Sequence, residues 1–342
     1  MRIPILDRLF RSRVPAPDRP AQLEIEPLID RDFPDPDVIS VDGEYFAYST
    51  NSVYDGALVN VPVWRAPALG GPWSMIGDAM PELPAWVADS AHGGSHVWAP
   101  DVVPASQGGY LLYFTAHHAR HLVQCLGVAV SASPAGPFRA VGDDALVVQP
   151  EDGDTLDATS FVDGGPGTGR RYLIYKSGRL YSTVWLRELS ADGTRAVSDR
   201  RELFRSDRRE EANIVESPLL VQRGRDNGSG YVVFYSANWF NSGRHFVNYA
   251  TADRIDGMFT KAPGALLTGD AVGDGYSDTG HQDVVAGPDG DYLFFHALGR
   301  NRERAMFAVG LDWTPDGEPL VASHRPPRPA GPAGPDPVTL ST

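Results

Sequence analysis

The chain has 342 residues, 44 of them Asp or Glu and 30 of them Lys or Arg, so its formal net charge is −14. That acidity argues against a surface that binds nucleic acid or an anionic membrane. Hydrophobic residues make up 42% of the chain, which is ordinary for a globular protein and too high for a disordered one.

The sequence gives no indication of membrane insertion or secretion. No stretch reaches the roughly 18 uncharged apolar residues of a membrane-spanning helix, and Asp7, Arg8 and Arg11 interrupt the apolar residues at the N-terminus. The single cysteine, Cys125, cannot form an internal disulfide, which is consistent with a reducing compartment. We therefore expect a cytoplasmic protein, whose oligomeric state the sequence does not indicate.

Five segments along the chain repeat an alternating pattern of aromatic and aliphatic residues that is typical of strands. The runs are 59 to 65 residues apart and begin at Tyr45, Tyr110, Tyr172, Tyr231 and Tyr292. A shorter apolar strand precedes each run, and glycine-containing turns such as 41–44 and 287–291 join most of these pairs into hairpins. A further alternating strand recurs after the runs, so each repeat predicts a unit of three or four antiparallel strands.

Such a unit cannot bury its faces alone, so the five copies must pack against one another. The sequence therefore predicts an all-β fold, a five-bladed β-propeller in a single domain. We expect an N-terminal lead segment at 1–30, the propeller at 31–324 and a Pro-rich C-terminal tail at 325–342, either solvated or wrapped over the surface.

The residues that open the five innermost strands should meet at one mouth of the central channel. They are Asp35, Ala99 with its neighbour Trp98, Asp157, Glu216 and His281, aligned to within about one position. Carboxylates at close range oppose one another's ionisation, so a fold tolerates three of them for function more readily than for stability. One protonated and one ionised carboxyl across a pocket can hydrolyse a glycosidic bond, and a third can tune the acid.

These motifs resemble glycoside hydrolase family 43, five-bladed propeller enzymes that act on arabinose- and xylose-containing glycans. The resemblance runs from about Asp35 to Trp313 and rests on six motifs in order. They are D-P at 35–36, W-A-P-D-V at 98–102, D-x-x-x-F-x-D at 157–163, E-x-P at 216–218, G-H-x-x-V-V at 280–285 and R-A-M-F at 304–307.

The resemblance implies catalytic roles. Asp35 would be the general base that activates water, Glu216 the general acid, and Asp157 the residue that tunes and positions Glu216. Inversion of the anomeric configuration is implied as well, with the acid and base carboxyls roughly 6.5 to 9.5 Å apart. His281 matches a central histidine that in many members lies beside a metal ion; such an ion, for example calcium, would be structural or electrostatic, since the chemistry requires no cofactor.

Substrate should be bound by residues around the same mouth, where the loops after the second strands lie. Trp98, Trp239 and Phe240 are candidates for stacking on sugar rings, although each could pack between blades instead. Arg304 matches an arginine of the last blade that in the family reaches the sugar or the acid, and His281 completes the expected set.

We expect an inverting glycosidase that removes a terminal pentose, foremost α-L-arabinofuranose, from arabinan or arabinoxylan oligosaccharides. Too few residues follow the fifth blade for the extra β-sandwich of many xylosidase relatives. A β-xylosidase, a galactofuranosidase and a non-catalytic glycan-binding propeller are the alternatives. A retaining fructosidase-like propeller is a further rival, but its Asn-Asp-Pro-Asn motif is absent at 33–37.

Overall fold

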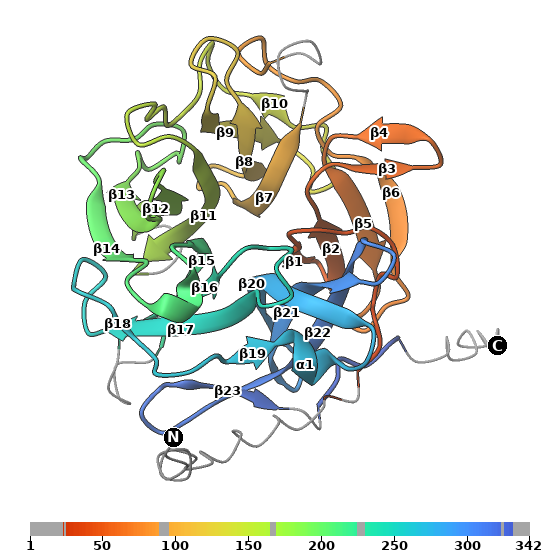
Figure 1. Ribbon diagram of the computed structural model, residues 1–342. Helices are drawn as coiled ribbons and strands as arrows, with labels where there is room; N and C mark the ends of the chain where they lie inside the picture. The colour runs from red at the N-terminus through yellow and green to blue at the C-terminus, as the bar shows by residue number, and fades with distance from the viewer. Residues whose placement is uncertain are drawn as a thin grey trace, which may run out of the picture.

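The computed structural model describes residues 23, 25–88, 96–164, 169–223, 230–322 and 325–330. In these ranges the chain forms five antiparallel sheets around a central axis (Figure 1), which confirms the expected five-bladed β-propeller. Helix in the same ranges is confined to a 3₁₀ turn, η2 (Arg209–Glu211), and a single turn, α1 (Gly269–Val272). No helix in the described part of the chain is long and apolar enough to cross a membrane.

Each blade pairs its strands in order from the channel outward. Blade I consists of β1 (Asp37–Val41), β2 (Glu44–Tyr48), β5 (Pro62–Ala66) and β6 (Ser74–Asp78). Blade II consists of β7 (Val97–Pro104), β8 (Tyr110–His117), β9 (Gln124–Ser131) and β10 (Arg139–Ala140). Blade III consists of β11 (Thr155–Asp163), β12 (Arg170–Ser177), β13 (Thr183–Glu188) and β14 (Arg201–Arg205).

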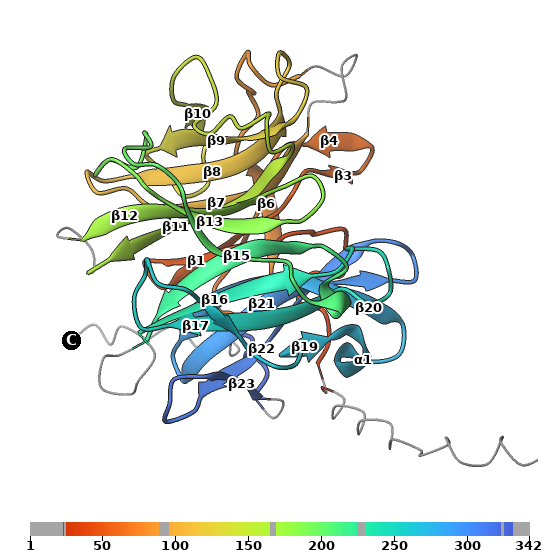
Figure 2. The same cartoon turned by 60° about the vertical axis from the view of Figure 1, so that its left-hand side comes forward.

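The remaining two blades follow the same order. Blade IV consists of β15 (Val215–Gln222), β16 (Tyr231–Ala237), β17 (Phe246–Ala252) and β18 (Thr260–Lys261), and β19 (Leu267–Thr268) also pairs with β17. Blade V consists of β20 (Tyr276–Gly287), β21 (Gly290–Gly299), β22 (Arg304–Trp313) and β23 (Pro319–Ala322). A small hairpin, β3 (Ser52–Tyr54) and β4 (Ala57–Val59), projects on the same side as α1 (Figure 2).

The aromatic runs form the second strands and pack between neighbouring blades. Tyr113 and Tyr175 belong to one buried cluster that joins blades II and III. Phe234 and Phe295 belong to another that joins blades IV and V. Full burial of a side chain of this size stabilises the fold by about 1.5 to 3 kcal/mol, so the repeated aromatic pattern is what holds the blades together.

The segment before blade I pairs with the last blade and so closes the ring. The backbone N–H of Phe33 donates to the carbonyl of Arg304 (2.7 Å), and that of Leu28 donates to the carbonyl of Met306 (2.8 Å). Both acceptors lie on β22, along the edge that β23 occupies further on. The chain thus extends blade V before it enters blade I.

The described part of the C-terminal segment, 325–330, makes a second closure. The carbonyl of Arg325 accepts the N–H of Gly310 (2.8 Å) in blade V, and the carbonyl of Arg328 accepts the N–H of Gly70 (3.0 Å) in blade I. The Arg325 guanidinium also donates to the carbonyl of Leu311 (3.0 Å). These residues wrap over the surface, which is one of the two arrangements expected for the tail.

Carboxylates deeper in the channel link one inner strand to the next. Each accepts a hydrogen bond from a backbone N–H of the following blade: Val38 donates to Asp283 (2.8 Å), Val102 to Asp37 (2.9 Å) and Ser160 to Asp101 (3.0 Å). Burial is the main cause that raises the pKa of Asp101 to about 8. These acids lie two residues past the strand openings, where they join neighbouring blades and do not face the mouth of the channel.

Candidate active site

Each of the five inner strands has a residue in the left-handed backbone region near its opening, before β1 and within the first half of β7, β11, β15 and β20. The φ angles are 57° for Asp35, 46° for Ala99, 58° for Asp157, 53° for Ser217 and 48° for His281. The strand register is broken at the same place in blades II to V. Residues other than glycine adopt this conformation at a cost of about 1 to 3 kcal/mol each, and bulges of this kind re-aim side chains beside active sites.

This geometry defines the alignment of the fourth opening, which the sequence gives only to within about one position. Ser217, not Glu216, occupies the position of Asp35 and Asp157, so Glu216 lies one residue earlier. Its cross-strand partner is Ser236. The Glu216 carboxyl group contacts His245 and Lys176, whereas that of Asp157 bonds to the backbone of Ser217.

Side chains from the preceding blade satisfy the N–H groups of four of these strained residues. Each acceptor lies at or just beyond the end of a second strand. The bonds run from Ala99 to Thr50 Oγ1 (2.8 Å), from Asp157 to Thr115 Oγ1 (3.2 Å), from His281 to Ser236 Oγ (2.8 Å) and from Asp35 to His296 Nδ1 (3.0 Å). The openings are therefore held from blade to blade around the mouth.

Asp35 lies among groups that favour its ionised form. Thr50 Oγ1 donates to Asp35 Oδ2 (2.5 Å), and Arg304 Nη1 lies 3.3 Å from Asp35 Oδ1. Nδ1 atoms of His281 and His296 lie 3.5 and 3.3 Å from the same Oδ1. Burial alone would raise the pKa of Asp35, but Arg304, His281 and the Thr50 hydroxyl outweigh it and hold the pKa well below its usual range. His296 acts as a neutral ring, because burial lowers its pKa and its Nδ1 accepts the N–H of Asp35.

Asp157 fixes the backbone that follows Glu216. The N–H of Ser217 donates to Asp157 Oδ2 (2.9 Å), and the Ser217 hydroxyl lies 3.3 Å from the same oxygen. Burial raises the pKa of Asp157; His281 opposes this rise, and the charges of Glu216 and Asp35 add to it. Asp157 therefore favours its protonated form more than Asp35 does.

Glu216 has a basic group near each carboxyl oxygen. Nε2 of His245 lies 3.3 Å from Oε1, and Nζ of Lys176 lies 3.9 Å from Oε2. Burial raises the pKa of Glu216, but the contact with His245 and the charge of Lys176 outweigh it and lower the pKa. The side chain remains 17% exposed, so it can reach a ligand in the mouth.

The sequence profile of the glycosyl hydrolases of family 43 matches residues 25–319. The chain belongs to this family. A curated relative from Aspergillus flavus, named "Probable arabinan endo-1,5-alpha-L-arabinosidase C", is 32% identical over 92 residues, which are 27% of this chain and 26% of the relative. Across the curated relatives the chain matches between 26% and 42% of their length.

Solved structures of family 43 enzymes share the fold. An endo-1,4-beta-xylanase from Bacteroides thetaiotaomicron has a TM-score of 0.72 at 22% identity, covering 87% of this chain and 96% of that one. An endo-arabinase from the same organism has a TM-score of 0.67 at 17% identity, covering 85% and 98%. At these identities the likeness establishes the propeller and leaves the substrate open.

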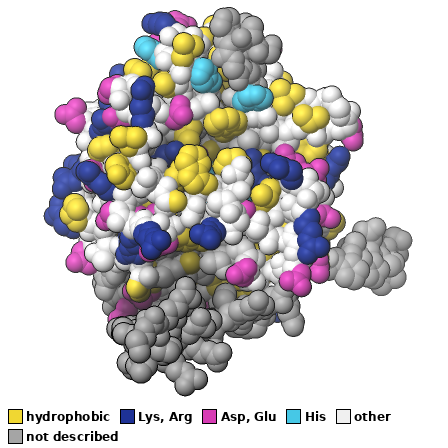
Figure 3. All heavy atoms as spheres, in the orientation of Figure 1, with side chains coloured by type: hydrophobic (Ala, Val, Ile, Leu, Met, Phe, Trp, Pro, Cys, Tyr) yellow, Lys and Arg dark blue, Asp and Glu magenta, His cyan; other side chains and the backbone are white. Residues whose placement is uncertain are grey.

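The expected substrate-binding residues differ in their contacts and in their exposure to solvent. His281 Nδ1 lies 2.9 Å from the Ser217 hydroxyl, and the Arg304 guanidinium lies over the Phe240 ring at 5.6 Å from its centroid. Trp239 and Phe240 are 56% and 46% exposed, so neither packs between blades. Trp98 is half-buried in β7. Figure 3 shows hydrophobic side chains near the middle of the face seen in Figure 1, with basic side chains beside them.

Several contacts of this family 43 site carry no motif in the sequence. Thr50, Lys176, Ser217, His245 and His296 touch the three carboxyls or their backbone, yet none stands at an expected opening. Lys176 had one usable signal, since it is one of two lysines in the chain.

The metal ion implied by the family resemblance finds no ligand set here. No group of three or more His, Cys, Asp or Glu side chains is arranged to hold a metal within the ranges the structure covers. Nδ1 of His281 already lies within hydrogen-bond distance of Ser217. These residues do not fit a metal site formed by protein ligands, so no step below passes through a metal.

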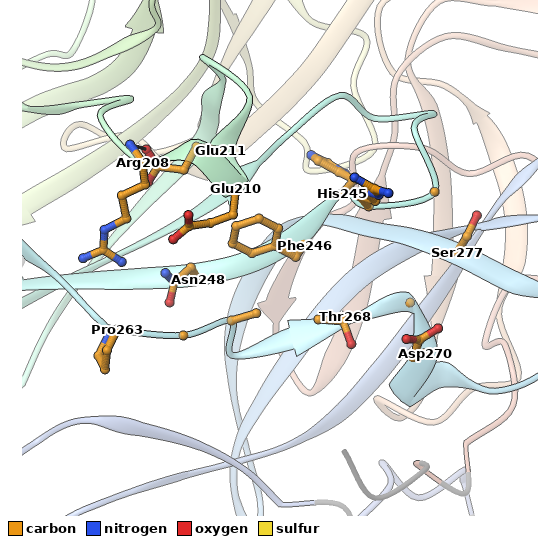
Figure 4. Close-up of a pocket in the computed structure, with 15 residues that line it drawn as sticks. Arg208, Glu210, Glu211, His245, Phe246, Asn248, Pro263, Thr268, Asp270 and Ser277 are labelled. Atoms are coloured by element: carbon orange, nitrogen blue, oxygen red, sulfur yellow. Dashed lines mark hydrogen bonds between the residues drawn. The ribbon is translucent and has the colours of Figure 1, made fainter. Parts of the chain in front are cut away.

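A pocket of about 460 Å³ lies beside the central mouth, in blade IV (Figure 4). Its walls include Glu210, Phe246, Asn248 and Asp270, and none of the three central carboxyls. His245 also lines it and stands between this pocket and Glu216. The space therefore borders the site without containing its reactive groups.

Proposed function

We propose that this protein is an inverting α-L-arabinofuranosidase that removes terminal arabinose from arabinan- or arabinoxylan-derived oligosaccharides. Asp35 is the general base and Glu216 the general acid. The observation that carries the proposal is the contrast between Asp35, which Arg304 at 3.3 Å keeps ionised, and the buried carboxyls of Asp157 and Glu216 in the same mouth, where Asp157 holds the Ser217 backbone and His245 and Lys176 face Glu216.

The reaction needs a water molecule between Asp35 and the anomeric carbon. Asp35 takes a proton from this water as the oxygen attacks, and Glu216 gives a proton to the departing glycosidic oxygen. One turnover leaves Asp35 protonated and Glu216 ionised, and exchange with solvent restores both. Because Asp35 begins ionised, it can act as the base without a prior deprotonation.

Glu216 must hold a proton when the substrate is bound. In the free site, burial raises the pKa of Asp157, whereas His245 and Lys176 lower that of Glu216, so the proton shared by this pair of neighbouring carboxyls favours Asp157. A glycosidic oxygen that accepts a hydrogen bond from Glu216 favours the protonated form of Glu216. Substrate binding thus moves the proton of the pair toward the acid, while Asp157 keeps its hold on the Ser217 backbone.

The sugar would be bound by the groups that surround the three carboxyls. Arg304 can donate to ring hydroxyls from its position beside Asp35, and the exposed rings of Trp239 and Phe240 offer apolar faces. Arabinose is favoured as the glycone because the curated relatives are named for arabinan. β-Xylose and galactofuranose are the alternatives on the same scaffold.

Internal cleavage of arabinan is the second candidate. It is favoured by the printed names of the curated relatives, which specify endo action. Product analysis separates the two: release of arabinose alone from the chain end supports exo action, whereas an early ladder of oligosaccharides supports endo action.

The proposal is tested by screening 4-nitrophenyl glycosides of arabinofuranose, xylose and galactofuranose with the wild type, Asp35→Asn and Glu216→Gln. We expect turnover of the arabinofuranoside by the wild type. General acid and base groups each contribute roughly 10² to 10⁴-fold. Asp35→Asn should lose activity on the 4-nitrophenyl glycoside, whereas Glu216→Gln should lose most on arabino-oligosaccharides, whose leaving alcohol needs protonation. Both variants should remain folded. A folded wild type that turns over no pentoside, yet binds oligosaccharides, would instead support a glycan-binding propeller.

A further inference from the structure

The five blades can be compared with one another at the end of the second strand. In blades II, IV and V, the residue opposite the one just before the strained opening is Thr115, Ser236 or His296. The corresponding residue in blade III, opposite Leu156, is Lys176. The three residues of the other blades each accept a backbone N–H from the next blade, as Thr50 does in blade I.

Lys176 cannot take this structural role. An ammonium group only donates hydrogen bonds, so the N–H of Ser217, the next opening, is satisfied by Asp157 Oδ2 instead (2.9 Å). Burying a cation costs free energy unless it is paired. A hydroxyl group at this position could accept the backbone N–H of the next blade, as in the other blades. The lysine is therefore not explained by the bonds that join the blades.

The Lys176 ammonium is directed at the acid. Its side chain is 8% exposed, and among the described residues the carboxylate within 4.0 Å of its Nζ is that of Glu216, at 3.9 Å from Oε2. The departure from the blade pattern therefore occurs in the blade that neighbours the proposed acid.

The other oxygen of Glu216 is faced by a histidine that is itself held in place. His245 Nε2 lies 3.3 Å from Oε1, and the ring is 2% exposed. A carboxylate behind it, Asp278, accepts the consecutive N–H groups of Gly243, Arg244 and His245, each at 3.0 Å. Figure 4 shows His245 at the start of β17, beside the pocket. Glu216 thus has one basic group from blade III and one from blade IV.

We propose that Lys176 is a positioning residue for the general acid: together with His245 on the opposite oxygen, it orients the Glu216 carboxyl group toward the leaving oxygen and stabilises the carboxylate that proton transfer leaves behind. This inference rests on the proposed function. A fixed cation aimed at developing negative charge acts most strongly where water is excluded. The effect of Lys176 on kcat should be greatest for substrates whose leaving oxygen must be protonated by the general acid.

The decisive variant is Lys176→Thr, which gives blade III the hydroxyl that other blades have. We expect its resistance to urea to equal or exceed that of the wild type, because the threonine can accept a backbone N–H without a buried cation. On arabino-oligosaccharides, whose leaving alcohol needs protonation, kcat should fall by about 10 to 100-fold, a part of the effect of a general acid. On the 2,4-dinitrophenyl arabinofuranoside, whose leaving group needs none, kcat should change little.

Two further measurements exclude a merely structural role. In the Glu216→Gln background, Lys176→Thr should cause no additional loss, because the two residues act through one proton transfer. The titratable and charged groups that face Glu216 are Lys176, His245, Asp157 and Asp35. Removing the cation raises the pKa of the acid, so the alkaline limb of the kcat profile should move to higher pH, which a loss of folded protein would not cause.

Lys261→Met is the matched control. Lys261 is the second lysine of the chain and is buried against Glu211 at 2.7 Å, away from the mouth. Replacement of Lys261 should lower the stability of the fold and leave the ratio of kcat on oligosaccharides to kcat on the dinitrophenyl substrate unchanged. Lys176→Met repeats the main test with a side chain of similar length.

Equal losses on both leaving groups, or full activity of Lys176→Thr on oligosaccharides, would overturn the inference while the proposed function stood. A wild type that cleaves none of the substrates would overturn the proposed function and this inference with it.

Discussion

Replacing Asp278 by asparagine should release the loop that carries His245. Asp278 is 2% exposed; Oδ1 accepts the N–H groups of Arg244 and His245, and Oδ2 accepts that of Gly243. Its φ is 49°, which asparagine tolerates, so Asp278→Asn changes the hydrogen bonds and not the backbone preference. An amide has one acceptor oxygen, so its NH₂ group must face an N–H that needs an acceptor.

The size of the effect follows from these bonds. A hydrogen bond to a charged group contributes about 1.5 to 3 kcal/mol, and an unpaired buried donor costs about 1 to 3 kcal/mol. With its amide oxygen in the place of Oδ1, Asp278→Asn removes the charge from the bonds to Arg244 and His245 and leaves the N–H of Gly243, an exposed residue that water can reach, without its acceptor. We therefore expect the free energy of unfolding to fall by about 1 to 3 kcal/mol, and kcat on oligosaccharides to fall because His245 leaves Glu216.

Urea unfolding followed by tryptophan fluorescence, together with kcat on an oligosaccharide, measures both effects. Asp270→Asn is the control, since Asp270 is an exposed carboxylate eight positions away and should change stability by no more than about 0.5 kcal/mol. If Asp278→Asn unfolds and turns over substrate like the control, the buried carboxylate does not hold the loop and the derivation of His245's position is refuted.

Three further results follow from the structure. Arg304→Met removes the cation beside Asp35, so the pKa of Asp35 should rise toward its usual range and the acid limb of kcat/KM should move to higher pH; an unmoved limb would exclude the pairing. Asp101 has a raised pKa of about 8, so its contribution to stability is present below its unfolded pKa and is lost as pH rises toward 8; Asp101→Asn should flatten this decline in urea titrations, and an unchanged slope would contradict it. Arg325→Ala removes contacts of the C-terminal closure, so the Tm should fall without a change in KM, and an unchanged Tm would argue against this closure.

The repeated architecture could be predicted because it has a periodic cause. Each aromatic run beginning at a residue such as Tyr110 or Tyr231 forms a second strand whose two faces pack against neighbouring blades. Such a buried strand appears in the sequence as a run of alternating large apolar residues, so it can be recognised without a structure. Counting the runs was therefore enough to obtain five blades and to place the openings at one mouth.

The details of the site depend on backbone conformation and on contacts between blades, neither of which can be inferred from the alternation of apolar residues. The left-handed residue at each opening shifts the phase of the strand, and residues other than glycine give no sequence sign of it. The sequence therefore aligns Glu216 with Asp157 only to within about one position, and Ser217 holds the matching position. Lys176 and His245 reach Glu216 from another blade and from a loop, so their roles arise from tertiary packing alone. Asp35 could be recognised as a site residue because it stands at one of the five strand openings that repeat along the sequence.

The central claim is that Asp35 and Glu216 cleave a pentoside with inversion. Proton NMR of the first-formed sugar from an α-L-arabinofuranoside tests it most directly, since inversion delivers the β anomer before mutarotation. We expect β-arabinofuranose from the wild type and no product from Asp35→Asn. An α anomer formed first, or turnover that survives Asp35→Asn, would contradict it.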